Sequence, residues 1–297
     1  MPAVLACWHI GGASAAGKRR SEETMPTICI TNQKGGVGKT TTAVNVAAAL
    51  AGYFEKRVLL IDFDTQCNAT RAFGYDSGSG GEVRLGHLLE MAEDGQTNLP
   101  IEKAILPVEV PLLDLLPGQK RLAKYLPDHR PDLLAAVLGG LSSRPDFTII
   151  DCPPGLNLLT TNAIFASDWA IVPCEHAVFS LEGLADLLAM LEQLASAKRD
   201  FDPTNFYRIL LTKVNPARKR STEYVVQELT PYKDKLFRTV IRENDSLNQA
   251  HAAGKPVFLY DSSSVGAMCY HALTRELLDY EETRIQKEQL ARAGQPD

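Results

Sequence analysis

The sequence is poor in the features that mark secreted, zinc-binding and membrane-spanning proteins. Its six cysteines are widely scattered, and no two of them form a C-x-x-C pair. The chain therefore predicts neither a zinc site nor a disulfide framework, and we expect a cytoplasmic protein with reduced thiols. Residues 2–10 are apolar but too few to span a membrane, and the basic residues 18–20 follow them, which is opposite to the order in a secretory signal.

An excess of positive charge is also missing. The chain has 31 Lys and Arg against 36 Asp and Glu, a net charge of −5, which argues against a surface coated with basic residues for nucleic acid. One segment reverses this sign, because residues 201–260 contain ten Lys or Arg and six Asp or Glu. Its candidate contacts to a DNA backbone are Arg218, Lys219, Arg220 and Arg242. An ordinary solvated loop face is the alternative.

Hydrophobic residues make up 45% of the chain and charged residues 23%, which is typical of a globular protein with a large core. We predict a flexible extension over residues 1–24 and one domain over residues 25–297. Met25 and Pro26 stand directly before the first apolar run, so Met25 is a candidate start of the chain. A short basic arm at residues 18–20 is the alternative interpretation of the extension.

A glycine-rich loop between an apolar run and an alanine-rich run is the most informative stretch. Residues 27–31 predict a strand and residues 39–51 predict a helix, which is the context that a phosphate-binding loop requires. Lys39 would reach the β and γ phosphates, and Thr40 would place its hydroxyl on a magnesium ion. The nucleotide-binding residues predicted by this pattern are Gly35, Gly36, Val37, Gly38, Lys39, Thr40 and Thr41. Lys34, at the start of the loop, carries a charge that its own loop does not need, and the alternative for it is a merely solvated side chain.

Two further apolar runs end in acids. Residues 58–64 end in Asp62 and Asp64, and residues 146–151 end in Asp151 before a Cys-Pro-Pro-Gly turn. Continuous apolar runs are typical of parallel strands covered on both faces, whose carboxyl ends bind ligands. We therefore predict that Asp151 lies on the magnesium side of the loop, as a Walker B acid does. Taken singly, these acids could also be loop residues or helix caps.

Residues 209–214 predict another strand, and Asn215 and Pro216 follow it. An amide both donates and accepts hydrogen bonds, which suits the edge of a purine base. The alternative is that Asn215 only forms a turn before the proline.

Further strands are predicted at residues 112–116 and 169–174, with helices at 85–92, 133–141 and 184–194. The tail from Val265 predicts a helix whose apolar residues are Met268, Leu273, Leu277 and Ile285.

Together these motifs resemble the deviant Walker A ATPases of the ParA/Soj and MinD family. The matching strings are KGGVGKT, DFDTQCNAT, DCPPG and residues 239–261, and the resemblance covers residues 25–278. It implies a single doubly wound α/β domain, mostly parallel, with helices on both faces. It also implies slow, partner-stimulated hydrolysis of ATP with Mg²⁺, in which Asp64 orients the water and Asp62 supports it near the metal. Asn215 and the loop after it would contact adenine.

The resemblance further implies a homodimer in the ATP-bound state. In the family the early lysine, here Lys34, crosses the dimer interface to the nucleotide of the other subunit, so Lys34, Lys39 and Asp64 are the predicted catalytic residues. The implied role is partition of a plasmid or chromosome together with a ParB-like protein. The chain would then associate with the nucleoid through nonspecific DNA contacts.

The chain departs from the family pattern at positions that affect whether it would bind DNA or another surface. Thr65 replaces a common proline, and Glu243 and Ser246 stand where the family often has two DNA-binding arginines. Asp245 lies between them, and the two acids Glu243 and Asp245 would repel phosphate. This keeps open a MinD-like or flagellar-type positioning regulator that acts on a protein scaffold or a membrane rather than on DNA. The charged tail lacks the apolar face of a membrane helix, so no membrane binding is expected. An iron–sulfur carrier ranks last, since no C-x-x-C is present.

Overall fold

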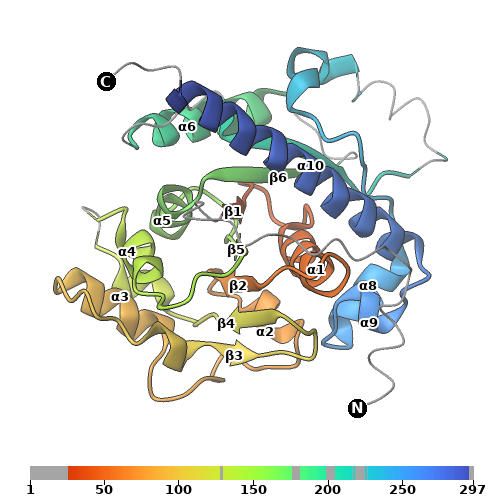
Figure 1. The fold of residues 1–297 in the computed structure, drawn as a ribbon. Coiled ribbons are helices and arrows are strands. Elements are labelled where there is room, and N and C mark those ends of the chain that lie inside the picture. Colours follow the sequence, from red (N-terminus) through yellow and green to blue (C-terminus); the bar gives the residue numbers. More distant parts are fainter. Residues whose placement is uncertain are drawn as a thin grey trace.

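The computed structural model describes residues 26–127, 130–175, 181–198, 205–215, 217, 225 and 227–293. Its centre is a seven-stranded sheet in the order β3-β4-β2-β5-β1-β6-β7 (Figure 1). All pairings are parallel except that of β3 with β4. The strands are β1 (Thr27–Ile30), β2 (Val58–Asp62), β3 (Leu106–Pro107), β4 (Leu113–Leu116), β5 (Phe147–Asp151), β6 (Trp169–Glu175) and β7 (Tyr207–Thr212).

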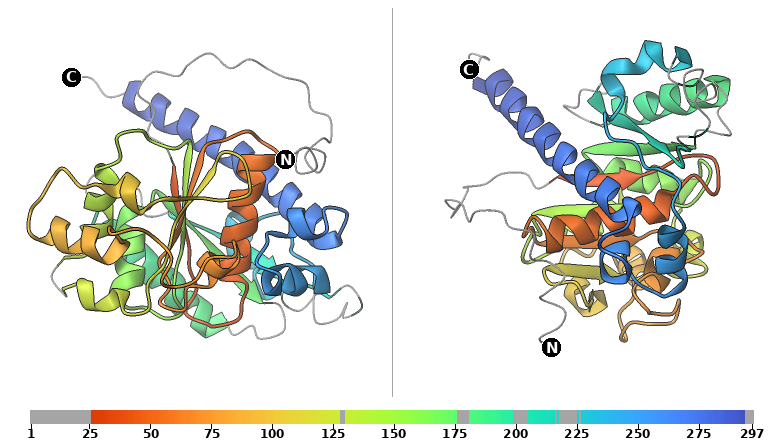
Figure 2. Two further views of the ribbon diagram at one scale, coloured as in Figure 1. Left: turned by 90° about the horizontal axis from the view of Figure 1, so that it is seen from below. Right: turned by 90° about the vertical axis from the view of Figure 1, so that its right-hand side faces the viewer.

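Helices cover both faces of this sheet, as the left view of Figure 2 shows. One face packs against α3 (Leu85–Glu93), α4 (Leu133–Gly139), α5 (Leu158–Ala166) and α6 (Leu181–Ser196). The other packs against α1 (Lys39–Gly52), α8 (Asp245–Ala252), α9 (Val257–Tyr260) and α10 (Val265–Ala293). The remaining short helices are α2 (Asn68–Arg71), η2 (Ile101–Ala104), η3 (Leu122–Tyr125) and η6 (Thr230–Lys235). The predicted doubly wound α/β domain is therefore confirmed.

The strand register brings the predicted acids to one edge. β5 lies between β1 and β2, with Asp151 opposite both Ile30 and Asp62. All residues of β2 and β5 are buried, because helices cover both sides of these central strands. The phosphate loop follows β1 directly, so the acids that end β2 and β5 lie beside it.

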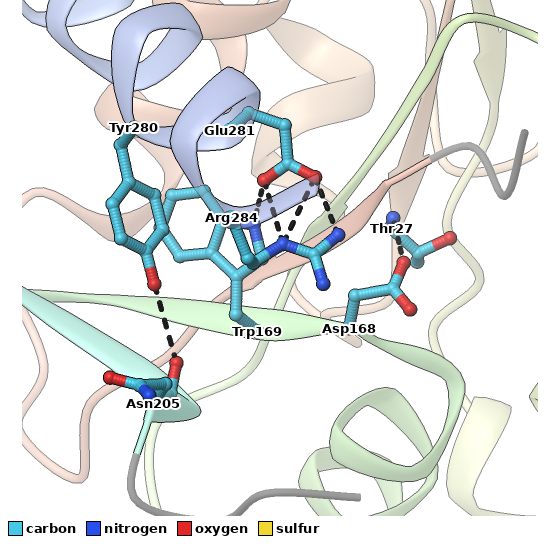
Figure 3. A network of polar contacts seen from close by, with 7 residues as sticks. All are labelled: Thr27, Asp168, Trp169, Asn205, Tyr280, Glu281 and Arg284. Atoms are coloured by element: carbon cyan, nitrogen blue, oxygen red, sulfur yellow. Dashed lines mark hydrogen bonds and ion pairs between the residues drawn. The ribbon is translucent and has the colours of Figure 1, made fainter. Parts of the chain in front are cut away.

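A buried polar cluster fixes the second half of α10, around Glu281 and Arg284, over the opposite end of the sheet (Figure 3). The indole N–H of Trp169 donates to Glu281 Oε2 at 2.9 Å, and the guanidinium of Arg284 pairs with Glu281 at 2.5 Å. Trp169 is fully buried and Glu281 is 3% exposed. Burial raises the pKa of the Glu281 carboxyl, and the bonds from Arg284 and Trp169 oppose that shift. The cluster joins the start of β6 to α10.

Several element boundaries differ from the sequence-based predictions. β7 ends at Thr212 rather than at residue 214, because Lys213 takes a left-handed conformation with φ of 52°. α4 ends at Gly139, two residues early, next to a second glycine. Met268, predicted as one of the apolar residues of the tail helix, is 57% exposed, whereas Leu273 and Leu277 are fully buried. Within the described residues, no helix is both long and apolar enough to cross a membrane.

Candidate functional site: a phosphate loop with three acids

The glycine-rich loop joins β1 to α1 in a conformation that only glycine adopts readily. Gly36 and Gly38 have φ angles of 76° and 91°, in the left-handed region. A Cβ built on Gly36 would meet nothing within 4 Å, so the loop borders open space. The N-terminus of α1 follows at Lys39, and its unpaired N–H groups and partial positive charge favour an anion there.

Lys39 points back into the loop. Its Nζ donates to the carbonyl oxygen of Lys34 at 2.9 Å, and the residue is 6% exposed. Burial lowers the pKa of Lys39, and the nearby carboxylates of Asp151 and Asp64 oppose that change. Lys34 itself is exposed, as are its neighbours Gln33 and Gly35. The two lysines of the loop therefore face different environments, one inside the site and one on its rim.

Long-range hydrogen bonds brace this loop, and sequence reasoning missed the residues that make them. Asn32 accepts from the backbone N–H of Lys34 at 3.0 Å and donates to the carbonyl of Pro173 at 2.7 Å. The hydroxyl of Thr212 donates to the carbonyl of Val37 at 2.9 Å. The only sequence signal for them is a polar residue at the carboxyl end of an apolar run.

Asp151 is the acid whose environment fits a magnesium ion. It is fully buried, and neither of its carboxylate oxygens has a hydrogen-bond partner among the described residues. Burial raises its pKa well above the usual range, and the charge of Asp62 adds to that shift, while the nearby Thr40 hydroxyl counteracts it. A buried carboxylate without partners is costly unless a cation compensates it. Together with the Thr40 hydroxyl it forms the kind of partial oxygen site that Mg²⁺ completes with phosphates.

No group of three or more His, Cys, Asp or Glu side chains forms a metal site by itself within the part of the chain that the structure describes. A Mg²⁺ ion at phosphates usually takes only one or two carboxylates from the protein. The remaining ligands of such an ion are waters and phosphate oxygens.

Asp62, predicted beside Asp151 as a second metal-side acid, has other partners. Its Oδ2 accepts from both the backbone N–H and the hydroxyl of Thr70, each at 2.7 Å, and its Oδ1 accepts from the backbone N–H of Asp64 at 3.2 Å. Burial raises its pKa to about 6 despite the bonds from Thr70. Asp62 therefore holds the segment 64–70 in place through Asp64 and Thr70. Its predicted role as support for the water-orienting acid stays a prediction. Its predicted contact with the metal stays a prediction.

Gly118 closes the pocket around Asp62. Its N–H donates to the hydroxyl of Thr70 at 2.9 Å, and a Cβ built on it would lie 2.8 Å from Cγ of Asp62 and 3.1 Å from the Asp62 backbone oxygen. Such distances require the strand end or the loop to move. Only a residue without a side chain fits there.

We expect Gly118→Ala to destabilise the fold by about 1–3 kcal/mol, the usual cost of forcing a methyl group into a packed site. Urea unfolding of the purified variant measures this. The matched control is Gly139→Ala at the exposed end of α4, where a Cβ would meet nothing within 4 Å, and which should be neutral or stabilising by up to about 1 kcal/mol. Equal stabilities of the two variants would contradict the close packing at Gly118.

Asp64 lies beside the loop at 5% exposure. Its Oδ1 accepts from the backbone N–H of Gln66 at 3.0 Å, which orients the carboxylate, and its own backbone N–H donates to Asp62, which holds the main chain. Its charge acts on Lys39, which places both at one site. This geometry is suitable for a carboxylate that positions a water molecule, the role predicted for it.

Of the residues predicted to contact adenine or DNA, the structure describes Asn215 and Arg242. Asn215 follows β7, where its amide is hydrogen-bonded within the protein, and Arg242 is exposed on the neighbouring segment. Backbone hydrogen bonds join Val214 to Ile241 and Glu243, so these two segments lie side by side. Other predicted positions lie outside the described residues: Pro216, Arg218, Lys219, Arg220 and the extension 1–24.

Comparison with known proteins identifies a family model and relatives that resemble this chain. Residues 25–202 match a family model described as "AAA domain". The chain is 36% identical over 258 residues to the chromosome partitioning protein ParA of Myxococcus xanthus, covering 84% of this chain and 87% of that protein. It is 38% identical over 256 residues to the sporulation initiation inhibitor protein Soj of Bacillus subtilis, covering 84% and 97%.

A solved structure with a similar fold is cobyrinic acid a,c-diamide synthase from Mycobacterium smegmatis with bound ADP and magnesium. The TM-score is 0.71 at 24% identity, covering 87% of this chain and 96% of that one. At this identity the likeness concerns the fold alone.

Proposed function

The chain belongs to the ParA/MinD family of deviant Walker A ATPases, on its ParA/Soj branch, and from this membership we propose that it binds ATP with Mg²⁺ and hydrolyses it to ADP and phosphate. The observation that supports this most directly is the buried carboxylate of Asp151 next to the phosphate loop, which accepts no hydrogen bond within the described part of the chain. Asp151 and Thr40 would hold the metal. Mg²⁺ bound there would neutralise charge on the β and γ phosphates.

The chain's own groups would bind and orient the nucleotide. The N–H groups of residues 35–40 would surround the phosphates, and Lys39 would exchange its bond to the Lys34 carbonyl for one to phosphate. Asp64 would hold the attacking water, with its backbone held by Asp62 and its carboxylate by the N–H of Gln66. These roles require only small movements of side chains that already lie at the site.

We further propose that ATP brings two copies together through the rim of the loop. Lys34 is exposed there while Lys39 is buried, so Lys34 is the lysine that can reach a second subunit's phosphates. Hydrolysis would remove the γ phosphate and release the dimer. The chain would then work as a switch that separates or positions a cargo in the cytoplasm.

We expect Lys34→Ala to keep measurable ATP binding but to lose most of the ATP-dependent dimer, because only the second subunit's phosphate contact is removed. Size-exclusion chromatography with a slowly hydrolysed ATP analogue and Mg²⁺ measures the dimer fraction. Lys103→Ala, at an exposed lysine of η2, is the matched control and should dimerise like the wild type. An unchanged dimer fraction in Lys34→Ala would count against the proposed interface.

For the surface on which the switch works we propose nonspecific DNA, with a ParB-like partner that stimulates hydrolysis and a plasmid or chromosome as cargo. The exposed Arg242 supports this, together with the basic residues 218–220 outside the described part. The acids Glu243 and Asp245 favour the alternative, a protein scaffold. Retention of long duplex DNA at low salt by the ATP-bound protein distinguishes them, and its absence would favour the scaffold.

A further inference from the structure

A groove beside α10 takes no part in the proposed nucleotide chemistry. It has a volume of about 460 Å³ and lies between α10 and the segment that joins η6 to α8. Ligand sites typically have volumes of about 300–1,000 Å³, so the groove is large enough to hold a few side chains of another molecule. Arg238 and Thr239 line it from the joining segment, and α10 contributes His271, Arg275, Glu276 and Asp279.

The groove lies away from the phosphate loop. The ring of His271 stacks on Phe54 with the centroids 5.3 Å apart and meets Tyr53 edge-on at 5.1 Å, and both of these residues directly follow α1. The phosphate loop is at the other end of this 14-residue helix, which is about 20 Å long. The ring contacts also fix the wall of the groove, so the groove exists before anything binds to it.

Two arginines face the groove from its two walls. The side chain of Arg238 is 84% exposed, and its Nε lies 3.5 Å from Oε1 of Glu276. Arg275 is exposed and forms no ion pair within the part of the chain that the structure describes. An exposed ion pair as long as that of Arg238 contributes little. Both guanidinium groups are therefore available to carboxylates of another molecule, which arginine can bind through two parallel hydrogen bonds.

The acids of the groove do not cancel this charge at its centre. Glu276 accepts from the backbone N–H groups of Arg238 at 2.7 Å and Thr239 at 2.9 Å. Burial acts to raise the pKa of the Glu276 carboxyl, but these bonds lower it, so the carboxylate is satisfied within the protein. Asp279 lies eight residues along α10 from His271, which places it at one end of the groove.

We propose that this groove is a docking site for an acidic segment of a partner protein, whose carboxylates pair with Arg238 and Arg275. The chain as a whole has a net charge of −5, so an acidic segment finds little attraction on the rest of its surface. An extended peptide directs successive side chains to opposite sides, so it can turn its carboxylates to the two arginines and away from Asp279.

Duplex DNA fits this groove less well than a peptide. It carries one negative charge per about 1.7 Å of its axis, so a duplex laid along α10 would bring phosphates against Asp279 as well as against the arginines. A peptide has no such fixed row of charges. The mixture of two arginines with an acid at the end of the groove therefore favours a protein segment.

The test measures fluorescence anisotropy with a labelled peptide of alternating glutamate and serine, at about 150 mM salt, where exposed charges are screened beyond about 8 Å. The wild type should bind this peptide and should not bind the same peptide with glutamine in place of glutamate. Replacing Arg238 and Arg275 together by alanine should weaken binding by about 5- to 30-fold, the cost of two exposed ion pairs. Arg144→Ala, at an exposed arginine between α4 and β5, is the matched control and should bind like the wild type.

The contrary outcomes are distinct. If the wild type does not bind the glutamate peptide, or binds the glutamine peptide equally well, the inference fails. An unchanged affinity in the double arginine variant would show that the peptide binds elsewhere. If that variant instead loses retention of duplex DNA and keeps its affinity for the peptide, the groove faces DNA. The proposed ATPase function is unaffected by any of these results, because the groove lies away from the phosphate loop.

Discussion

Replacing Asp64 by alanine is expected to lower the rate of ATP turnover by about 10²- to 10⁴-fold, the usual cost of a lost general base, while ATP still binds. The phosphate cradle consists of backbone N–H groups and Lys39, none of which the substitution removes. The carboxylate that would hold the water is removed, and the ATP-bound dimer should accumulate. A phosphate-release assay with saturating ATP and Mg²⁺ measures the rate.

Two further variants make this result specific. Asp64→Asn can still accept the hydrogen bond from Gln66 but is a much weaker base, so it should be nearly as slow as the alanine variant if proton transfer matters. Asp94→Ala removes an exposed acid beyond the end of α3 and should turn over ATP at the wild-type rate. Wild-type turnover in Asp64→Ala would remove Asp64 from the proposed mechanism.

Lys39→Ala is expected to weaken ATP binding by at least about 100-fold, the range found when one partner of a buried charge pair is truncated. Lys39 is buried beside the loop, and its charge interacts with the carboxylates of Asp151 and Asp64. Isothermal titration calorimetry with Mg²⁺ and ATP measures the affinity. An affinity within about threefold of the wild type would contradict the role of Lys39.

The Lys39 variant needs a folding control, because the lysine also bonds to the Lys34 carbonyl. If the variant unfolds at the same urea concentration as the wild type, its fold is intact, and the lost affinity results from the missing charge. The two lysine variants should lose different properties. Lys39→Ala should lose ATP binding, whereas Lys34→Ala should keep it and lose the ATP-dependent dimer.

The sequence predicted the fold and the central acids because both depend on local patterns. Continuous apolar runs that end in acids indicate buried parallel strands, and parallel strands place their carboxyl ends together. The strand register then brings Asp62 and Asp151 side by side without further information. For the same reason the position of the glycine-rich loop at the start of a helix follows from the residues on either side of it.

The bracing of the site could not be predicted, because it depends on residues far apart in the chain. Asn32 bonds to Pro173 and Thr212 bonds to Val37, and neither side chain belongs to a recognisable motif. The same applies to Gly118, whose requirement for glycine comes from Asp62 on another strand. The direction of single side chains could not be predicted either. Met268 is exposed to solvent although its residue type suggested the core.

The polar cluster in the second half of α10 has a practical consequence for imaging and purification. Glu281 and Arg284 fix this helix to Trp169, and α10 continues to Ala293 beyond that point (Figure 3). A fluorescent protein or affinity tag joined after the last residue would be attached well past the anchored turns, so the sheet and the phosphate loop should tolerate it. A chain truncated before Glu281 would instead remove the acceptor of the Trp169 indole N–H together with the part of α10 fixed to it, and such a fragment is a poor choice for live-cell work.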